Sequence, residues 1–508
     1  MSTSNAQLLQ ELLNPAKFNQ FASENYHSVG GQHNHFPTNE EVIAHLKLLK
    51  AFQVLKVKIV GIPAEESFDE NFSEFSAKQV KSWQAYLTNA ARRFIIFMSA
   101  LKYKFKFSEE FVPEQQQLVN YRSTAIAKVV AEYCRRNTPP MDVLMIWHAF
   151  SLNPKSYYDN GIRNNFLEFT FCPFPLFQIL QFIDNSTFEY LPSSSCVNNF
   201  ETLTKLYGIP LQFHYNLDIK MVLPIYCPQC QNLLAFDVPL TNQYNQGFAD
   251  PSFLTLAEKS CSYSQVSKMV THLELRKRQF TADLKTSHVP LANVTKQHSF
   301  ILSSASDKEK VSHIDQKIKK YGLLYNQFLN DSEDVTTYAL LVQRTRAKES
   351  TPSLTKIMQL YDHMNLIHLT IPPAHGVVQI SEDLVACTAR QERFVAKMNT
   401  FNWLSNPGSL TEIVEKSCSR YYKFLHLLIE YYKSEMLVPT MDIDLVWHTH
   451  QLSSLYYIQY CRTHSDLFVI DHDEKVNELK ISTRFEHTGI LYKHKYQEEY
   501  LICFCWYC

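Results

Sequence analysis

A pattern of aspartate, tryptophan and histidine occurs twice in this chain and constrains its fold more than any other feature. Residues 141–152 read MDVLMIWHAFSL, and residues 441–452 read MDIDLVWHTHQL. Identical residues recur at a constant offset of 300 positions, as Trp147 and Trp447 show. The residues repeated in this way are, in the first copy, Pro139, Met141, Asp142, Trp147, His148, Leu152 and Tyr157. Such an internal repeat predicts two related structural units, too few for a solenoid.

The segments before each copy have helical character. The same offset relates Arg93-Phe94 to Arg393-Phe394. Apolar residues follow three- and four-residue spacing over residues 40–60, 78–104 and 118–135, which predicts amphipathic helices. Pro139-Pro140 then ends one helix and suits the first turn of the next. We therefore expect helices that lead into a Trp-His helix in each unit.

A central segment has a residue pattern typical of strands and not of helices. Residues 211–239 contain short β-prone runs interrupted by Pro and Asn. The sequence thus predicts a mainly α fold with a small β-rich insert (α+β), in which each of two related helical units contains a D-x4-W-H helix. The expected domains are an N-terminal helical extension (1–75), a first Trp-His unit (76–210), the β-rich insert (211–300), a helical connector (301–370) and a second Trp-His unit with a C-terminal cysteine cluster (371–508).

Charge and hydropathy exclude several classes of protein. Lys and Arg number 49 against 50 Asp and Glu, a net charge of −1, so no basic field indicates a nucleic-acid partner. No segment approaches the roughly 20 apolar residues of a membrane span, and the first residues do not resemble a secretion signal. We expect a cytoplasmic protein, with a nuclear location as the alternative. Its 12 cysteines are then expected to be free thiols or metal ligands.

The Trp-His motif allows two interpretations. In a structural interpretation, Asp142 and Asp442 cap their helices, Trp147 and Trp447 fill the core, and His148 and His448 bond buried carbonyls. In a chemical interpretation, Asp444, His448 and His450 hold a metal ion. Asp444 and His448 would share one helix face, but His450 points nearly the opposite way, so the helix would have to be broken. The first copy has Leu144 and Phe150 in place of Asp444 and His450.

Two cysteine clusters are candidate zinc sites. Cys227 and Cys230 form a C-x-x-C pair, which Cys261 and His272 could complete, although Ser264 occupies the position of a fourth thiolate. The alternative is a knuckle that packs without metal. At the C-terminus, Cys503, Cys505 and Cys508 could form a soft-metal clip or an ordinary cysteine tail.

Several of these motifs resemble the glycine-rich domain protein-like family of fungi and plants. The resemblance rests on residues 139–154 and 441–452, and extends to IPPAH at 371–375, DHDEKV at 471–476, the closing CFCWYC and the C-P-Q-C insert. Phe150 departs from the family's usual W-H-x-H, Ser264 replaces an expected cysteine, and no glycine-rich tail is present. In plants, members of the family are linked to stress and developmental responses, and some carry an RNA-binding domain.

These sequence features are consistent with three hypotheses about function. The first is an intracellular interaction or scaffold protein with protein partners and structural zinc sites. The second is a metal-dependent hydrolase or oxidoreductase centred on Asp444, His448 and His450. The third is an RNA-associated stress-response protein, for which the sequence shows no RNP-like aromatic motif.

Overall fold

The fold was analysed in a computed structural model of the chain. The described residues are 7, 11–12, 36–61, 77–106, 125–258, 269–286, 289–294, 296, 305–324, 335, 337–348, 352–431, 434–465, 469–472 and 478–503.

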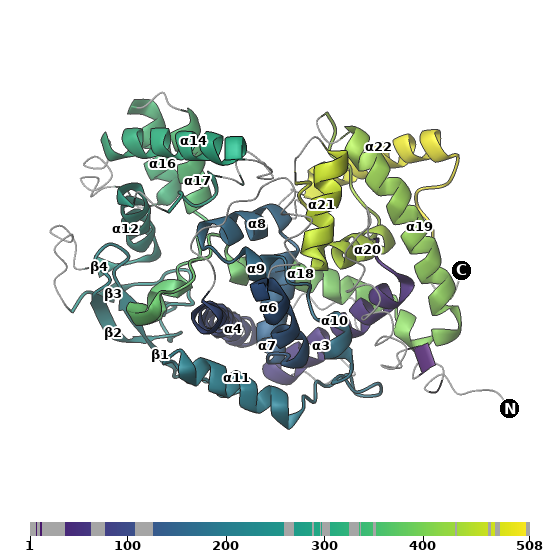
Figure 1. The fold of residues 1–508 in the computed structure, drawn as a ribbon, viewed down its shortest axis with the longest axis horizontal. Coiled ribbons are helices and arrows are strands. Elements are labelled where there is room, and N and C mark those ends of the chain that lie inside the picture. Colours follow the sequence, from purple (N-terminus) through teal and green to yellow (C-terminus); the bar gives the residue numbers. More distant parts are fainter. Residues whose placement is uncertain are drawn as a thin grey trace.

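The first half of the chain is helical and builds the centre of the molecule (Figure 1). A capping box formed by Thr38 and Glu41 starts its first long helix, which ends at Gly61 in the left-handed conformation (φ 72°). The Trp-His helix begins directly after Pro140. The helices are α3 (Asn39–Val60), α4 (Ala77–Phe105), α6 (Ala125–Arg136), α7 (Met141–Ser151), α8 (Pro154–Arg163), α9 (Leu167–Thr170), α10 (Leu176–Leu180) and α11 (Ser194–Leu206).

The β-rich insert follows α11 and leads into a separate helical layer. Strands β1 (Val222–Tyr226) and β2 (Leu233–Pro239) pair antiparallel, as do β3 (Thr255–Leu256) and β4 (Met269–Val270). The helices that come next are α12 (His272–Lys285), α14 (Ala305–Leu324), α16 (Tyr338–Lys348) and α17 (Pro352–Tyr361). They enclose a second hydrophobic core, distinct from the main one, and lie together at one corner of the molecule (Figure 1).

The second half returns to the main core and ends in four long helices. Its elements are η3 (Ile367–Thr370), η4 (Pro373–His375), α18 (Leu384–Thr400), η5 (Trp403–Ser405), α19 (Pro407–Tyr431), α20 (Met441–Leu452), α21 (Ser454–His464) and α22 (Glu478–Tyr496). The mainly α fold with a small β-rich insert is therefore confirmed. Among the described residues, no helix has the length and apolarity needed to cross a membrane.

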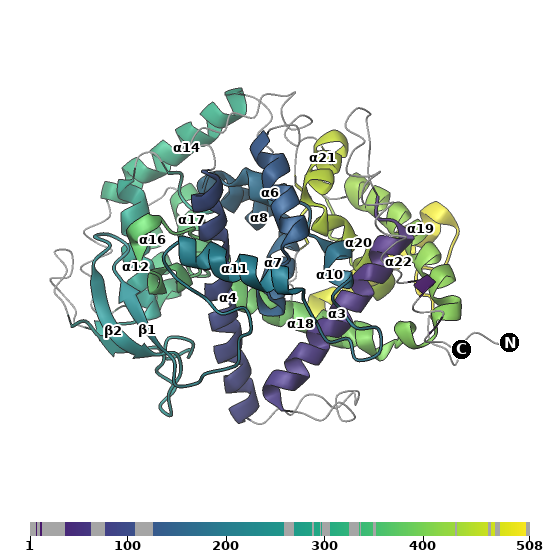
Figure 2. The ribbon, with the colours of Figure 1, turned by 60° about the horizontal axis from the view of Figure 1, so that its bottom comes forward.

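The two halves exchange helices. Helix α3 of the first half packs against α19 and α20 of the second, while α18 of the second half packs against α4 and α7 of the first. Figure 2 shows α3 running toward the second half. Glu392 on α18 accepts hydrogen bonds from Lys56 on α3, at 2.8 Å, and from Trp83 on α4. The halves thus share one continuous core.

Each half contains the same buried ion pair. Asp142 on α7 accepts a hydrogen bond from Arg93 Nε at 2.5 Å, and Asp442 on α20 accepts one from Arg420 Nε at 2.7 Å. Each arginine also donates to two backbone carbonyls of a later segment. The accepting residues are Gln212 and Phe213 in the first half and Glu499 and Tyr500 in the second.

These pairs correct two predictions from the sequence. Neither helix has a side-chain cap at its N-cap residue, and the two aspartates lie inside the first turn, where they neutralise a buried arginine. The counterpart of Arg93 is Arg420, and not Arg393. Arg93 lies 49 residues before its aspartate but Arg420 only 22, because α6 and its connections separate α4 from α7. The constant offset therefore fails before the motif.

Candidate metal centre

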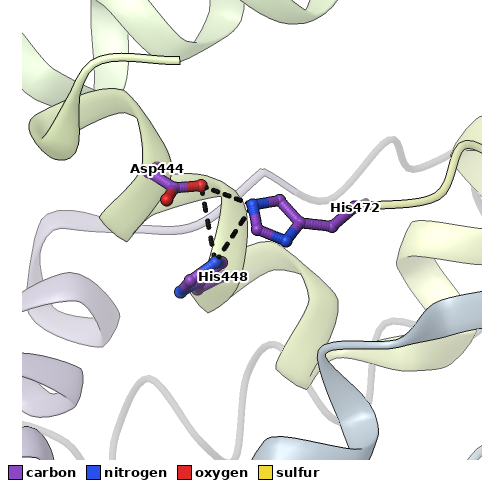
Figure 3. Close-up of side chains that lie close together, drawn as sticks. All are labelled: Asp444, His448 and His472. Atoms are coloured by element: carbon purple, nitrogen blue, oxygen red, sulfur yellow. Dashed lines mark hydrogen bonds and ion pairs between the residues drawn. The ribbon is translucent and has the colours of Figure 1, made fainter. Parts of the chain in front are cut away.

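Three ligand-type side chains converge beside α20 (Figure 3). Asp444 and His448 are one turn apart on this helix, so they project from the same face. His472 reaches them from the non-helical segment 469–472 that follows α21. His472 Nε2 lies 2.8 Å from Asp444 Oδ1 and 3.4 Å from His448 Nε2, and His448 Nε2 lies 3.4 Å from Asp444 Oδ1.

The three side chains lie in a largely enclosed, partly aromatic setting. The side chain of His448 is 1% exposed, that of His472 12% and that of Asp444 15%. Phe394 packs on the His448 ring, with centroids 4.4 Å apart, and Trp447 meets the His472 ring edge-on at 4.8 Å. Burial alone would raise the pKa of Asp444, but the two imidazoles and the hydrogen bond from His472 outweigh burial and hold that pKa below its usual value.

This arrangement matches the ligand spacing of a small divalent metal ion. Zinc binds imidazole nitrogen and carboxylate oxygen at about 2.0–2.2 Å, so ligands at two corners of a tetrahedron lie about 3.3–3.5 Å apart. The distances from His448 Nε2 to His472 Nε2 and to Asp444 Oδ1 are both 3.4 Å and fall in this range. The distance from His472 Nε2 to Asp444 Oδ1, 2.8 Å, is that of a hydrogen bond, and a bound ion would take the place of this bond. The 2-His-1-carboxylate set also suits iron(II). Asp444, His448 and His472 can therefore bind one ion and leave at least one coordination position open.

The first half has apolar residues at two of the three corresponding positions. Leu144 stands at the position of Asp444 in the repeat. Phe174 packs edge-on against Trp147 with centroids 5.1 Å apart, as His472 packs against Trp447. The repeated fold therefore does not require an acid and a second histidine at these positions. Packing alone does not explain why the second half has them.

His148, the counterpart of His448, takes part in a different contact. Its Nε2 lies 2.7 Å from Nε2 of His45 on α3, and His45 Nδ1 lies 2.9 Å from the hydroxyl of Thr449. That hydroxyl donates to the carbonyl of Leu445, so it accepts from His45 Nδ1, and His45 Nε2 in turn accepts from His148. Burial, followed by the effect of His448, lowers the pKa of His148 to about 3, so this bridge between the halves is uncharged.

His450 lies apart from the candidate ligand group of Asp444, His448 and His472. Helix α20 is unbroken through His450, so the side chain leaves on another face, where Nδ1 lies 2.8 Å from the hydroxyl of Tyr421. Its ring meets Tyr457 edge-on at 5.1 Å, just as Phe150 meets Tyr157 at 4.8 Å. His450 is thus a packing residue, and the proposed set of Asp444, His448 and His450 is corrected by exchanging His450 for His472. The only sequence signal for His472 was the DHDEKV stretch.

Comparison with known proteins bears on this half of the chain. Residues 355–460 match the family model described as glycine-rich domain-containing protein-like. This segment, about a fifth of the chain, is therefore similar to that family.

Two relatives from Arabidopsis thaliana share part of this chain. Glycine-rich domain-containing protein 2 is 31% identical over 127 residues, which are 23% of this chain and 15% of the relative. Glycine-rich domain-containing protein 1 is 28% identical over 127 residues, which are 23% of this chain and 14% of that relative. The match therefore spans only a small part of the length of either relative. No solved structure matches the chain significantly.

The segment that matches the glycine-rich domain-containing protein-like family includes Asp444 and His448 and ends before His472. The third ligand thus lies outside the matched segment. It reaches the site only because α21 turns the chain back toward α20.

The cysteine clusters are only partly described. Cys227 and Cys230 flank the turn between β1 and β2, where Gln231 N–H donates to the Cys227 carbonyl at 2.8 Å. His272 contacts Phe253 and lies 3.1 Å from the carbonyl of Phe248. Cys503 is exposed. Cys261, Cys505 and Cys508 lie outside the described residues. Among the described residues, the cysteines do not form a group of three ligands, and zinc at either cluster stays a prediction.

Proposed function

We propose that this chain is a metalloprotein that binds one divalent transition metal ion, zinc or iron(II), through Asp444, His448 and His472. The observation that supports this proposal is the convergence of two imidazole nitrogens and one carboxylate oxygen at metal-ligand spacing. The apolar counterpart in the first half adds weight, because the same fold is built there without these groups.

The ligand number favours catalysis over a purely structural role. Structural zinc sites use four protein ligands, whereas catalytic sites use three and bind water or substrate in the remaining position. A bound ion would polarise a substrate oxygen or activate a water molecule as zinc, and would support oxidation chemistry as iron(II). We therefore favour a metal-dependent hydrolase or oxidoreductase over a scaffold protein.

A double variant tests this proposal without disturbing the fold. Asp444→Leu with His472→Phe gives the second half the residue types that the first half already packs at these positions. We expect the purified wild-type protein to contain about one zinc or iron ion per chain, and the double variant to contain almost none while unfolding cooperatively.

The metal content is measured by elemental analysis, before and after reloading chelator-treated protein with Zn²⁺ or Fe²⁺. Cys227→Ser with Cys230→Ser serves as the control, because it removes the predicted knuckle ligands and leaves the Asp-His site intact. A wild-type protein that stays metal-free after reloading, or a double variant that binds as many ions per chain as the wild type, would contradict the proposal.

A further inference from the structure

We propose that Tyr457 is a positioning residue that holds His472 at the metal centre through a chain of two hydrogen bonds. This inference rests on the proposed metal site. Trp447 Nε1 donates to the Tyr457 hydroxyl at 3.0 Å, and that hydroxyl donates to the carbonyl of Ile470 at 2.8 Å.

The direction of both bonds is fixed by the chemistry of the groups. An indole N–H can only donate and a carbonyl can only accept, so the single phenolic proton of Tyr457 points to Ile470. Trp447 is 3% exposed, Tyr457 0% and Ile470 5%, so water does not compete for these bonds. Burial also raises the pKa of Tyr457 well above its usual value, which keeps the phenol protonated.

His472 depends on such an anchor more than the other two ligands do. Asp444 and His448 are fixed by the hydrogen-bonded backbone of α20. His472 instead belongs to the non-helical segment 469–472, two residues after the carbonyl that Tyr457 holds. Trp447 supports this segment in two ways: its N–H binds the Tyr457 hydroxyl, which holds Ile470, and its ring contacts the His472 ring edge-on. Because ligand groups need support to keep their geometry, this chain of bonds should set the position of the third ligand.

The first half supplies a matched control within the same molecule. Trp147 Nε1 donates to the Tyr157 hydroxyl at 3.0 Å, and Tyr157 is 1% exposed. The residues that correspond to the metal ligands on that side include Leu144 and Phe174, which cannot bind an ion. Tyr157→Phe therefore removes an equivalent buried hydroxyl without touching the proposed metal site.

The experiment compares Tyr457→Phe with Tyr157→Phe in the full-length chain. The affinity for Zn²⁺ is measured by competition with a chromophoric chelator, and the ligand geometry by the visible absorption of the Co²⁺-loaded protein. We expect Tyr457→Phe to weaken Zn²⁺ binding about tenfold and to change the Co²⁺ spectrum. Tyr157→Phe should leave both unchanged, although the two variants lose similar thermal stability without metal.

Several outcomes would overturn the inference. One is a Tyr457→Phe protein with wild-type affinity and spectrum, and another is an equal loss of affinity in Tyr157→Phe. If Tyr457→Phe does not fold, Trp447→Phe takes its place; it removes the first donor and part of the indole ring, and keeps a smaller aromatic ring in this buried position. We expect weakened metal binding in this variant, and wild-type binding would refute the proposal. A wild-type protein that binds neither Zn²⁺ nor Co²⁺ identifies a failure of the proposed function itself.

Discussion

At the scale of single residues, the internal repeat separates what the fold needs from what chemistry needs. Both halves place an aspartate against a buried arginine and a tryptophan against a tyrosine hydroxyl. Only the second half adds Asp444 and His472. Residues that are the same in both halves are explained by the fold that the halves share. Polar residues found in the second half alone, such as Asp444 and His472, are not explained by that fold and point to a function of this half.

The buried ion pair of the first half gives a direct test at this scale. Arg93 and Asp142 have side chains that are 4% and 3% exposed. Asp142→Asn leaves the guanidinium buried without a counter-charge, although its bonds to the carbonyls of Gln212 and Phe213 remain. We expect the free energy of unfolding in urea to fall by about 3 kcal/mol.

The control for this measurement is an ion pair on the surface. Glu412→Gln breaks the exposed pair with Lys416, and we expect it to leave the urea midpoint unchanged. Equal effects of Asp142→Asn and Glu412→Gln would show that the buried pair does not hold α4 and α7 together.

At the scale of secondary-structure elements, the sequence predicted those features that depend on residues close together in the chain. Helical spacing predicted the long helices, and the four-residue step from Asp444 to His448 predicted a shared face. His472 lies 24 residues after His448 in the sequence. The two side chains meet because α21 packs back against α20, and a periodic sequence pattern does not predict such a tertiary contact. The capping prediction failed because an acid at the start of a helix can neutralise an arginine from another helix just as well as it can cap.

Helix α8 can pack closely on α9 because Gly161 has no side chain. A Cβ placed on Gly161 would lie 2.9 Å from Leu167 Cδ2 and would collide with the Thr170 hydroxyl, both on α9. Alanine favours helices by about 1 kcal/mol over glycine, but the clash with packed neighbours should dominate. We expect Gly161→Ala to lower the free energy of unfolding by about 1–3 kcal/mol.

A second glycine provides the comparison. Among the described residues, the nearest atom to a Cβ added on Gly408 in α19, apart from its chain neighbours and the helix's own backbone, is Asn406 Oδ1 at 3.8 Å. Gly408→Ala should therefore leave stability unchanged or raise it by up to about 1 kcal/mol, as measured by the same urea titration. Stabilisation by Gly161→Ala would mean that α8 and α9 are free to separate.

At the scale of the whole molecule, the exchange of α3 and α18 makes the two halves interdependent. Helix α3 lies against α18, α19 and α20, and the ring of His45 bonds to both His148 and Thr449. The proposed metal ligands all belong to the second half, but helix α20, which carries two of them, is covered by α3 from the first half. The repeat is therefore a pair of units in sequence and a single folding unit in structure.

This interdependence predicts the behaviour of the chain when it is divided between residues 351 and 352. Residues 352–508 alone lack α3, α4 and α7, so the faces of α18, α19 and α20 that these helices cover would be exposed to water. We expect this fragment to show no cooperative thermal unfolding and to bind Zn²⁺ weakly, even though it contains Asp444, His448 and His472. Co-expression with residues 1–351 should yield a complex that co-purifies, melts cooperatively and recovers the metal affinity of the intact chain. Since all three ligands are present in both samples, the difference measures how far the first half holds the second in the shape that the metal centre needs. If a fragment of residues 352–508 melts cooperatively and binds Zn²⁺ as tightly as the intact chain, the second half does not need the helices of the first half to fold or to bind metal.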